Sequence, residues 1–142
     1  MTSAFWDSSG FVKLLIEEPG RDVAVDAWND ADRNIASRLT IPEVSAALAA
    51  AWRSGRINER SDREVRRRWA QHLGSVELVE LSAAVGDRAA SLAVEHALSG
   101  ADAVHLASAL LLSHVDPVLI TWDRRLAAAA ALVGLSVAPS DF

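Results

Sequence analysis

The chain has 142 residues, of which 51% are hydrophobic, so it has the size of one domain and can bury a sizeable core. It contains no cysteine, which excludes a disulfide scaffold and a thiolate zinc site and suits a reducing compartment. The net charge of −5 does not by itself indicate a nucleic-acid binder.

The first half of the chain alternates short apolar runs with helical patterns. Strands are predicted over residues 3–6 and 34–38. Apolar residues at helical spacing predict helices over 8–17, 21–29, 40–54 and 59–73. Pro19-Gly20, Gly55 and Gly74 punctuate these helices, and we expect Gly74 to cap the last of them.

The second half continues the same alternation. Strands are predicted over 76–81, 117–121 and 135–138, and helices over 82–97, 101–113 and 124–132. Strands that alternate with helices indicate an α/β fold with a mainly parallel sheet covered on both faces. We expect residues 1–142 to form a single domain.

The ends and the apolar runs bear on localisation. The N-terminus lacks the basic and apolar regions of a signal peptide, and no apolar run reaches the ~18 residues of a membrane span. We therefore expect a cytoplasmic protein with no membrane partner.

Acidic residues recur at strand ends and in the first turns of helices, namely at Asp7, Glu43, Asp102 and Asp123. Ligands bind open parallel sheets outside the carboxyl ends of the strands, where such acids can converge. Each acid also has a purely structural interpretation. Residues 40–43 and 99–102 fit capping boxes, and Asp7 and Asp123 fit N-caps. Half-buried acids destabilise a fold unless they are paired or bind a metal ion. The occurrence of four such acids at similar positions therefore favours a common acidic site.

Clustered carboxylates would repel one another unless some are protonated or a cation neutralises them. With no cysteine and no paired histidines, the ligands are hard oxygens, which favour Mg²⁺ or Mn²⁺. The matching chemistry is attack of a metal-activated water on a phosphodiester. A histidine acid–base ribonuclease is disfavoured, because no spacing places two imidazoles together. We interpret His105 as a packing residue, with a hydrogen bond to Asp102 as the alternative.

The basic residues are unevenly distributed. Residues 53–68, which include Arg53 and Arg56, hold seven arginines against three acids, so they carry +4 and leave −9 on the rest. This stretch is either a solvated helical face or a surface that faces phosphate or a partner. Lys13 and Arg124 lie near the predicted acidic edge and either bind phosphate or balance the acids. The tryptophans on a strand or on apolar stripes are interpreted as core residues, with base stacking as the minor alternative: Trp6, Trp28, Trp52 and Trp69.

Four segments together resemble the motifs of PIN-domain nucleases: Asp-Ser-Ser-Gly-Phe-Val-Lys-Leu at 7–14, Leu-Thr-Ile-Pro-Glu-Val-Ser-Ala-Ala-Leu at 39–48, Asp-Ala-Val-His-Leu-Ala-Ser-Ala at 102–109 and Leu-Ile-Thr-Trp-Asp-Arg-Arg-Leu at 119–126. They occur in the family's order, and the resemblance spans residues 5–138. The small size and the lack of an appended domain make the chain similar to VapC-type toxins of toxin–antitoxin pairs.

The resemblance implies a three-layer α/β/α sandwich and Mg²⁺-dependent ribonuclease activity, with Mn²⁺ as a substitute. It implies that the metal-site acids are Asp7, Glu43, Asp102 and Asp123, and that Ser8 and Thr121 orient their carboxylates. It also implies a homodimer, an RNA substrate and a VapB-like antitoxin. The antitoxin would face the helical pair at about 41–73, so Arg53 and Arg56 have two candidate partners, RNA and the antitoxin.

Other functions are less consistent with the sequence. Haloacid-dehalogenase phosphatases carry a second aspartate two residues after the first, which Asp7-Ser8-Ser9 lacks. Receiver domains cluster two acids near the end of the first strand, and this chain does not. A non-catalytic module of the same fold, which binds RNA or protein without turnover, remains the alternative.

Overall fold

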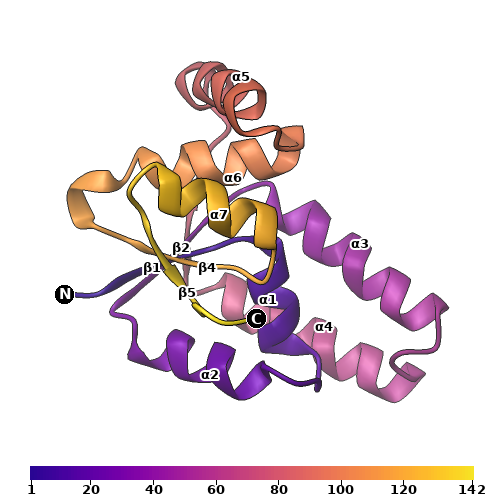
Figure 1. Ribbon diagram of the computed structural model, residues 1–142. Coiled ribbons are helices and arrows are strands. Elements are labelled where there is room, and N and C mark those ends of the chain that lie inside the picture. Colours follow the sequence, from indigo (N-terminus) through magenta and orange to yellow (C-terminus); the bar gives the residue numbers. More distant parts are fainter.

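A fully parallel, five-stranded sheet forms the middle of the molecule in the computed structural model, which describes residues 1–142 (Figure 1). Its strands are β1 (Ser3–Trp6), β2 (Arg33–Ser37), β3 (Val76–Val79), β4 (Val118–Ile120) and β5 (Ser136–Ala138). The spatial order is β3-β2-β1-β4-β5. The chain therefore builds the sheet outward from β1 to one edge, then returns to add β4 and β5 on the other side of β1.

Helices cover both faces of this sheet, which confirms the three-layer sandwich (Figure 1). One layer contains α1 (Ser8–Leu15), α2 (Arg21–Asp30), α3 (Thr40–Arg53) and α4 (Glu59–Leu73). The other contains α5 (Ala83–His96), α6 (Gly100–Leu110), the short 3₁₀ helix η1 (Ser113–Val115) and α7 (Arg124–Leu132). None of the helices combines the length and the apolar character needed to cross a bilayer.

The alternation of side chains along β1 divides the core into two clusters. Phe5 points to the cluster built with α5, α6 and α7, whereas Trp6 points to the cluster built with α1, α3 and α4. Both side chains are fully buried, because helices cover both faces of the central strand. Trp6 stacks on Phe11 with 5.4 Å between ring centroids, which fixes α1 against the end of β1.

The predicted elements are all present, and the differences lie at their ends. The predicted helix over 101–113 stops at Leu110 and gives way to η1. Gly74 is the C-cap of α4, as predicted, and has right-handed helical angles (φ −63°). The interpretation of Trp52 as a core residue is wrong. Trp52 is 48% exposed, because the end of α3 extends beyond the sheet (Figure 1).

Candidate active site

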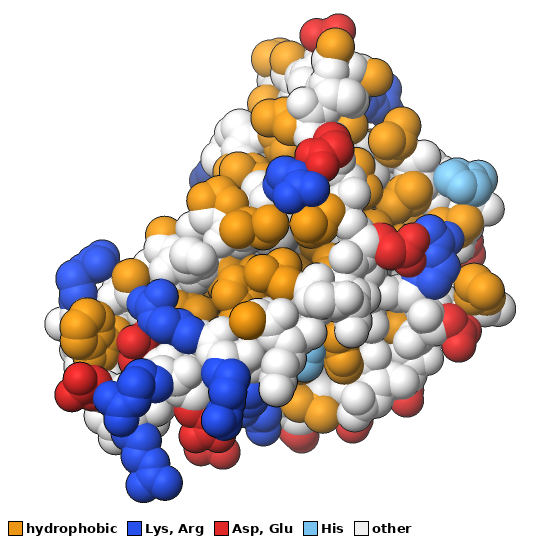
Figure 2. Space-filling view, turned by 180° about the vertical axis from the view of Figure 1, so that it is seen from behind, with side chains coloured by type: hydrophobic (Ala, Val, Ile, Leu, Met, Phe, Trp, Pro, Cys, Tyr) orange, Lys and Arg blue, Asp and Glu red, His pale blue; other side chains and the backbone are white.

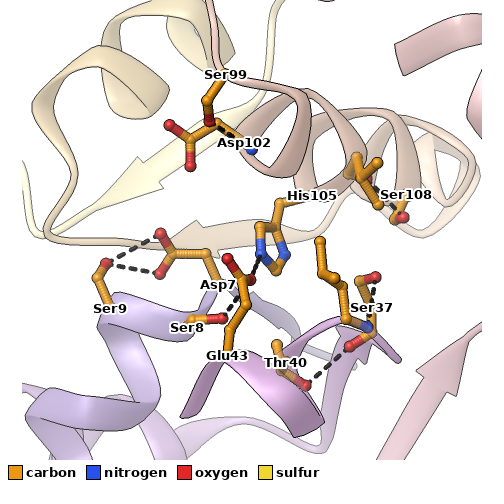
Figure 3. A network of polar contacts seen from close by, with 12 residues as sticks. Asp7, Ser8, Ser9, Ser37, Thr40, Glu43, Ser99, Asp102, His105 and Ser108 are labelled. Carbon is orange, nitrogen blue, oxygen red and sulfur yellow. Dashed lines mark hydrogen bonds and ion pairs between the residues drawn. The ribbon is translucent and has the colours of Figure 1, made fainter. Parts of the chain in front are cut away.

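The candidate site lies at the carboxyl ends of β1 and β4, where the order in which the chain adds strands to the sheet reverses. Trp6 pairs with Ile120 in the parallel register, so the next residues along each strand, Asp7 and Thr121, lie side by side. The Asp7 N–H donates to the Ile120 carbonyl at 3.3 Å and closes the ladder there. The first turns of α3 and α6 bring Glu43 and Asp102 to the same region (Figure 3).

Asp7 is a buried carboxylate held by several donors, with only 3% of its surface exposed. It is the N-cap of α1 and accepts the Gly10 N–H at 2.9 Å. The Thr121 hydroxyl donates to Oδ2 at 2.7 Å, and the Ser9 hydroxyl lies 2.8 and 2.9 Å from the two oxygens. Burial raises the pKa of Asp7 above its ordinary value, although these donors act to lower it. Asp7 thus caps a helix and also presents an acid to the site.

Gly10 allows the first turn of α1 to approach the sheet closely. A Cβ at this position would lie 2.8 Å from the Ile120 carbonyl oxygen and 2.9 Å from the Trp6 ring. Any larger residue would push α1, and with it the cap at Asp7, away from the end of β4.

Glu43 does not cap its helix, so the capping-box interpretation of residues 40–43 is wrong. The N-cap of α3 is Leu39, and the Thr40 hydroxyl donates to the Ser37 carbonyl instead. Glu43 Oε1 accepts the Ser8 hydroxyl at 2.7 Å and lies 2.6 Å from His105 Nε2. Burial acts to raise the pKa of Glu43, but the bonds from His105 and Ser8 outweigh it and leave the pKa below its ordinary value. Glu43 is therefore ionised at neutral pH.

Asp102 and Asp123 form a second pair of acids from two further helices. Ser99 caps α6 by accepting the Asp102 N–H at 3.1 Å, and Asp123 caps α7 by accepting the Leu126 N–H at 3.0 Å. Burial and the neighbouring charge of Asp123 together raise the pKa of Asp102 to about 6. A shift of this kind marks two carboxylates that compete to ionise in one place.

The donor chemistry of the site fits a hard divalent cation. Figure 3 shows the side chains of Asp7, Glu43 and Asp102 directed toward a shared space between α1, α3 and α6. As they stand, no three acidic or histidine side chains lie close enough together to chelate one ion. Mg²⁺ is usually bound by one or two carboxylates and retains several waters, so a closed protein cage is not required. The carboxylate oxygens are therefore suited to hold such an ion partly through water.

The two hydroxyls expected near the acids are in place, and two further residues join them. The Ser8 hydroxyl donates to Glu43 and the Thr121 hydroxyl donates to Asp7, so both contact acids of the candidate site. Ser9 was missed, although its place two residues after Asp7 is typical of a side chain that turns back onto a capping acid. His105 is buried, as expected for a packing residue, but the alternative interpretation named the wrong acid: the ring bonds to Glu43 on another helix and not to Asp102. No local signal in the sequence reports that pairing.

Two of the four basic residues singled out by the sequence are engaged in ion pairs. Lys13 and Arg56 bind the two oxygens of Glu18, at 3.1 and 2.8 Å. Arg53 and Arg124 are exposed and form no ion pair. Figure 2 shows lysine and arginine side chains gathered over the region of α3 and α4, where the arginine-rich stretch lies.

Comparisons with known proteins show which family the chain belongs to. The PIN domain family model matches residues 4–132. The chain is 44% identical over 141 residues to Ribonuclease VapC45 of Mycobacterium tuberculosis (strain CDC 1551 / Oshkosh), with 99% of this chain and 98% of that protein covered. Its fold is similar to PAE2754 from Pyrobaculum aerophilum, with a TM-score of 0.69, 24% identity, and 96% and 89% of the two chains covered. A toxin-antitoxin complex from Klebsiella pneumoniae is also similar, with a TM-score of 0.62, 23% identity, and 84% and 86% covered. With a family match over most of its length and a full-length relative of this identity, the chain belongs to the PIN-domain family.

Proposed function

We propose that this chain is a Mg²⁺-dependent endoribonuclease that acts in the cytoplasm as the toxin of a type II toxin–antitoxin pair. The observation that carries the proposal is the meeting of acids from separate elements at one sheet edge, with the pKa of Asp102 raised to about 6 by burial and by Asp123. The 44% identity to a protein named as a ribonuclease supports the reaction class. Hard oxygen donors with no cysteine support Mg²⁺, or Mn²⁺ in its place.

In the proposed mechanism, one or two cations would be held, directly or through water, by Asp7, Glu43, Asp102 and Asp123. A metal ion bound there would supply an acidified water and would offset the charge that develops on the phosphate. Ser8, Ser9 and Thr121 donate hydrogen bonds to the carboxylates and fix their orientation. Water adds to phosphorus while the 3′ oxygen leaves and takes a proton, which yields 5′-phosphate and 3′-hydroxyl ends.

Helix termini reinforce the same site. Asp7 and Asp123 stand at the N-termini of α1 and α7, and Glu43 and Asp102 lie in the first turns of α3 and α6. The free backbone N–H groups and the positive dipole end of each helix favour anionic groups nearby. This arrangement moderates the repulsion among the acids and favours an incoming phosphate.

The proposed partners are an RNA substrate, a second copy of the chain and a VapB-like antitoxin. The similarity to a solved toxin-antitoxin complex supports the antitoxin. Arg53 and Arg124 are the better candidates for contacts with RNA or antitoxin, because Lys13 and Arg56 already neutralise Glu18.

The test is cleavage of total cellular RNA by the purified chain with Mg²⁺, in parallel with EDTA. We expect cleavage that EDTA abolishes, and loss of cleavage in Asp7→Asn and in Asp102→Asn. Asp87→Asn is the matched control, because Asp87 is exposed on α5 and belongs to no part of the site. Full activity in either site variant would remove that acid from the mechanism. Absence of Mg²⁺-dependent cleavage by the wild type would favour the non-catalytic binding module.

A further inference from the structure

The bond between His105 and Glu43 joins two parts of the molecule that otherwise make little contact. α6, which carries His105, packs mainly on α5, α7 and β2, whereas α3 packs mainly on α1 and α4. The 2.6 Å contact between His105 Nε2 and Glu43 Oε1 therefore links the two helical layers across the carboxyl edge of the sheet (Figure 3).

The chemistry of the two groups identifies the donor. A carboxylate oxygen accepts hydrogen bonds, so in this 2.6 Å contact Glu43 Oε1 is the acceptor and His105 Nε2 is the donor. The Ser8 hydroxyl donates to the same oxygen at 2.7 Å. Both donors thus converge on Oε1 and leave Oε2 without a protein donor, free to face a cation.

His105 is poorly explained as a packing residue. The side chain is 2% exposed, and its second ring nitrogen, Nδ1, is buried with no hydrogen-bond partner. A buried polar atom without a partner is destabilising, and an apolar side chain would avoid it. The presence of an imidazole here is therefore explained by the hydrogen bond between Nε2 and Glu43, which is the one hydrogen bond of the ring.

We propose that His105 is a positioning residue, which holds Glu43 through Oε1 so that Oε2 is directed to the catalytic divalent cation. The inference rests on the proposed function and names the group that fixes this carboxylate. His105 itself touches neither the metal nor the RNA.

The experiment compares His105→Leu with His105→Gln, since the glutamine amide can place an N–H donor close to the position of the histidine Nε2. The exposed His114 supplies a matched control, His114→Leu. Two quantities are measured: the affinity for Mn²⁺ alone by titration calorimetry, and kcat and KM on a short RNA with Mg²⁺. We expect His105→Leu to weaken Mn²⁺ binding ~10–100-fold and to lower kcat with KM for RNA unchanged. His105→Gln should recover most of both losses.

Two results would overturn the inference: wild-type Mn²⁺ affinity in His105→Leu, or equal losses in the leucine and glutamine variants. A wild type that binds Mn²⁺ but cleaves no RNA would refute the proposed function, while calorimetry of the variants still decides the role of His105. A wild type that binds no Mn²⁺ would refute both. If His105→Leu fails to fold, nitrogen-15 NMR of wild-type histidine provides the test. Nε2 should be protonated and its signal should shift on addition of Mg²⁺, and an unprotonated Nε2 refutes the proposal.

Discussion

Replacing Thr121 by valine tests the buried network around Asp7. The hydroxyl is fully buried, donates to Asp7 Oδ2 at 2.7 Å and accepts the Asp123 N–H at 2.9 Å. A hydrogen bond to a charged group contributes ~1.5–3 kcal/mol and one to a neutral group ~1 kcal/mol. Valine has nearly the same shape as threonine, so the loss of stability comes from the missing hydrogen bonds and not from a cavity. We expect the free energy of unfolding to fall by about 3 kcal/mol, which lowers Tm by about 10 °C in a chain of this size.

The assay is urea and thermal unfolding of metal-free Thr121→Val, with Thr121→Ser as the control that keeps the hydroxyl. Because the Thr121 donor lowers the pKa of Asp7, its contribution is present where Asp7 is ionised and is lost as the pH falls. The difference between the variants should therefore shrink in acid. If the valine variant unfolds within about 1 °C of the serine variant at neutral pH, the two hydrogen bonds of Thr121 do not contribute the stability assigned to them.

Three further predictions concern the same edge of the sheet. Asp7→Asn should raise the Tm of the metal-free protein at pH 7.5 but not near pH 4. Burial raises the folded pKa of Asp7 above the unfolded value, so this carboxyl destabilises the fold progressively as the pH rises from the unfolded pKa to the folded pKa, and asparagine removes that loss. A lower Tm at pH 7.5 would contradict this. Mn²⁺ affinity measured by calorimetry should increase between pH 5 and pH 7.5, since Asp102, with a pKa of about 6, must lose its proton to bind, and a flat profile would exclude it as a ligand. Gly10→Ala should lower the free energy of unfolding by ~1–3 kcal/mol, measured in urea, because its Cβ would meet the Ile120 carbonyl at 2.8 Å, and unchanged stability would show that α1 shifts freely.

The sequence was sufficient for the order of elements and for the acids at the strand ends. Strand β1 is buried on both faces, so it is apolar from Ala4 to Trp6, and the acid that follows this run stands out. The helix over 59–73 has the predicted limits, because Asn58 caps its start through the Ser61 N–H. Strand ends were placed less well. Residues 80 and 81 were predicted to extend the third strand, but β3 ends at Val79, before the exposed Leu81.

Contacts between side chains that lie far apart in the sequence could not be inferred from local patterns. His105 lies three residues from Asp102 on the same helix, so local spacing favoured that acid, whereas the actual partner is Glu43, 62 residues away. The exposed Trp52 has a similar explanation. It continues the apolar stripe of α3, but no spacing rule shows where the helix leaves the sheet. Tertiary arrangement decides both cases.

The division of the site between the two layers affects when the protein becomes active during its synthesis. Asp7 and Glu43 are made early, whereas Asp123 and the edge strand β5 follow the other acids and strands along the chain. A nascent chain in which residues 118–138 are not yet folded lacks two strands of the sheet and one of the acids. Under the proposed function, the early half of the chain therefore cannot cut RNA before the later half has folded against it.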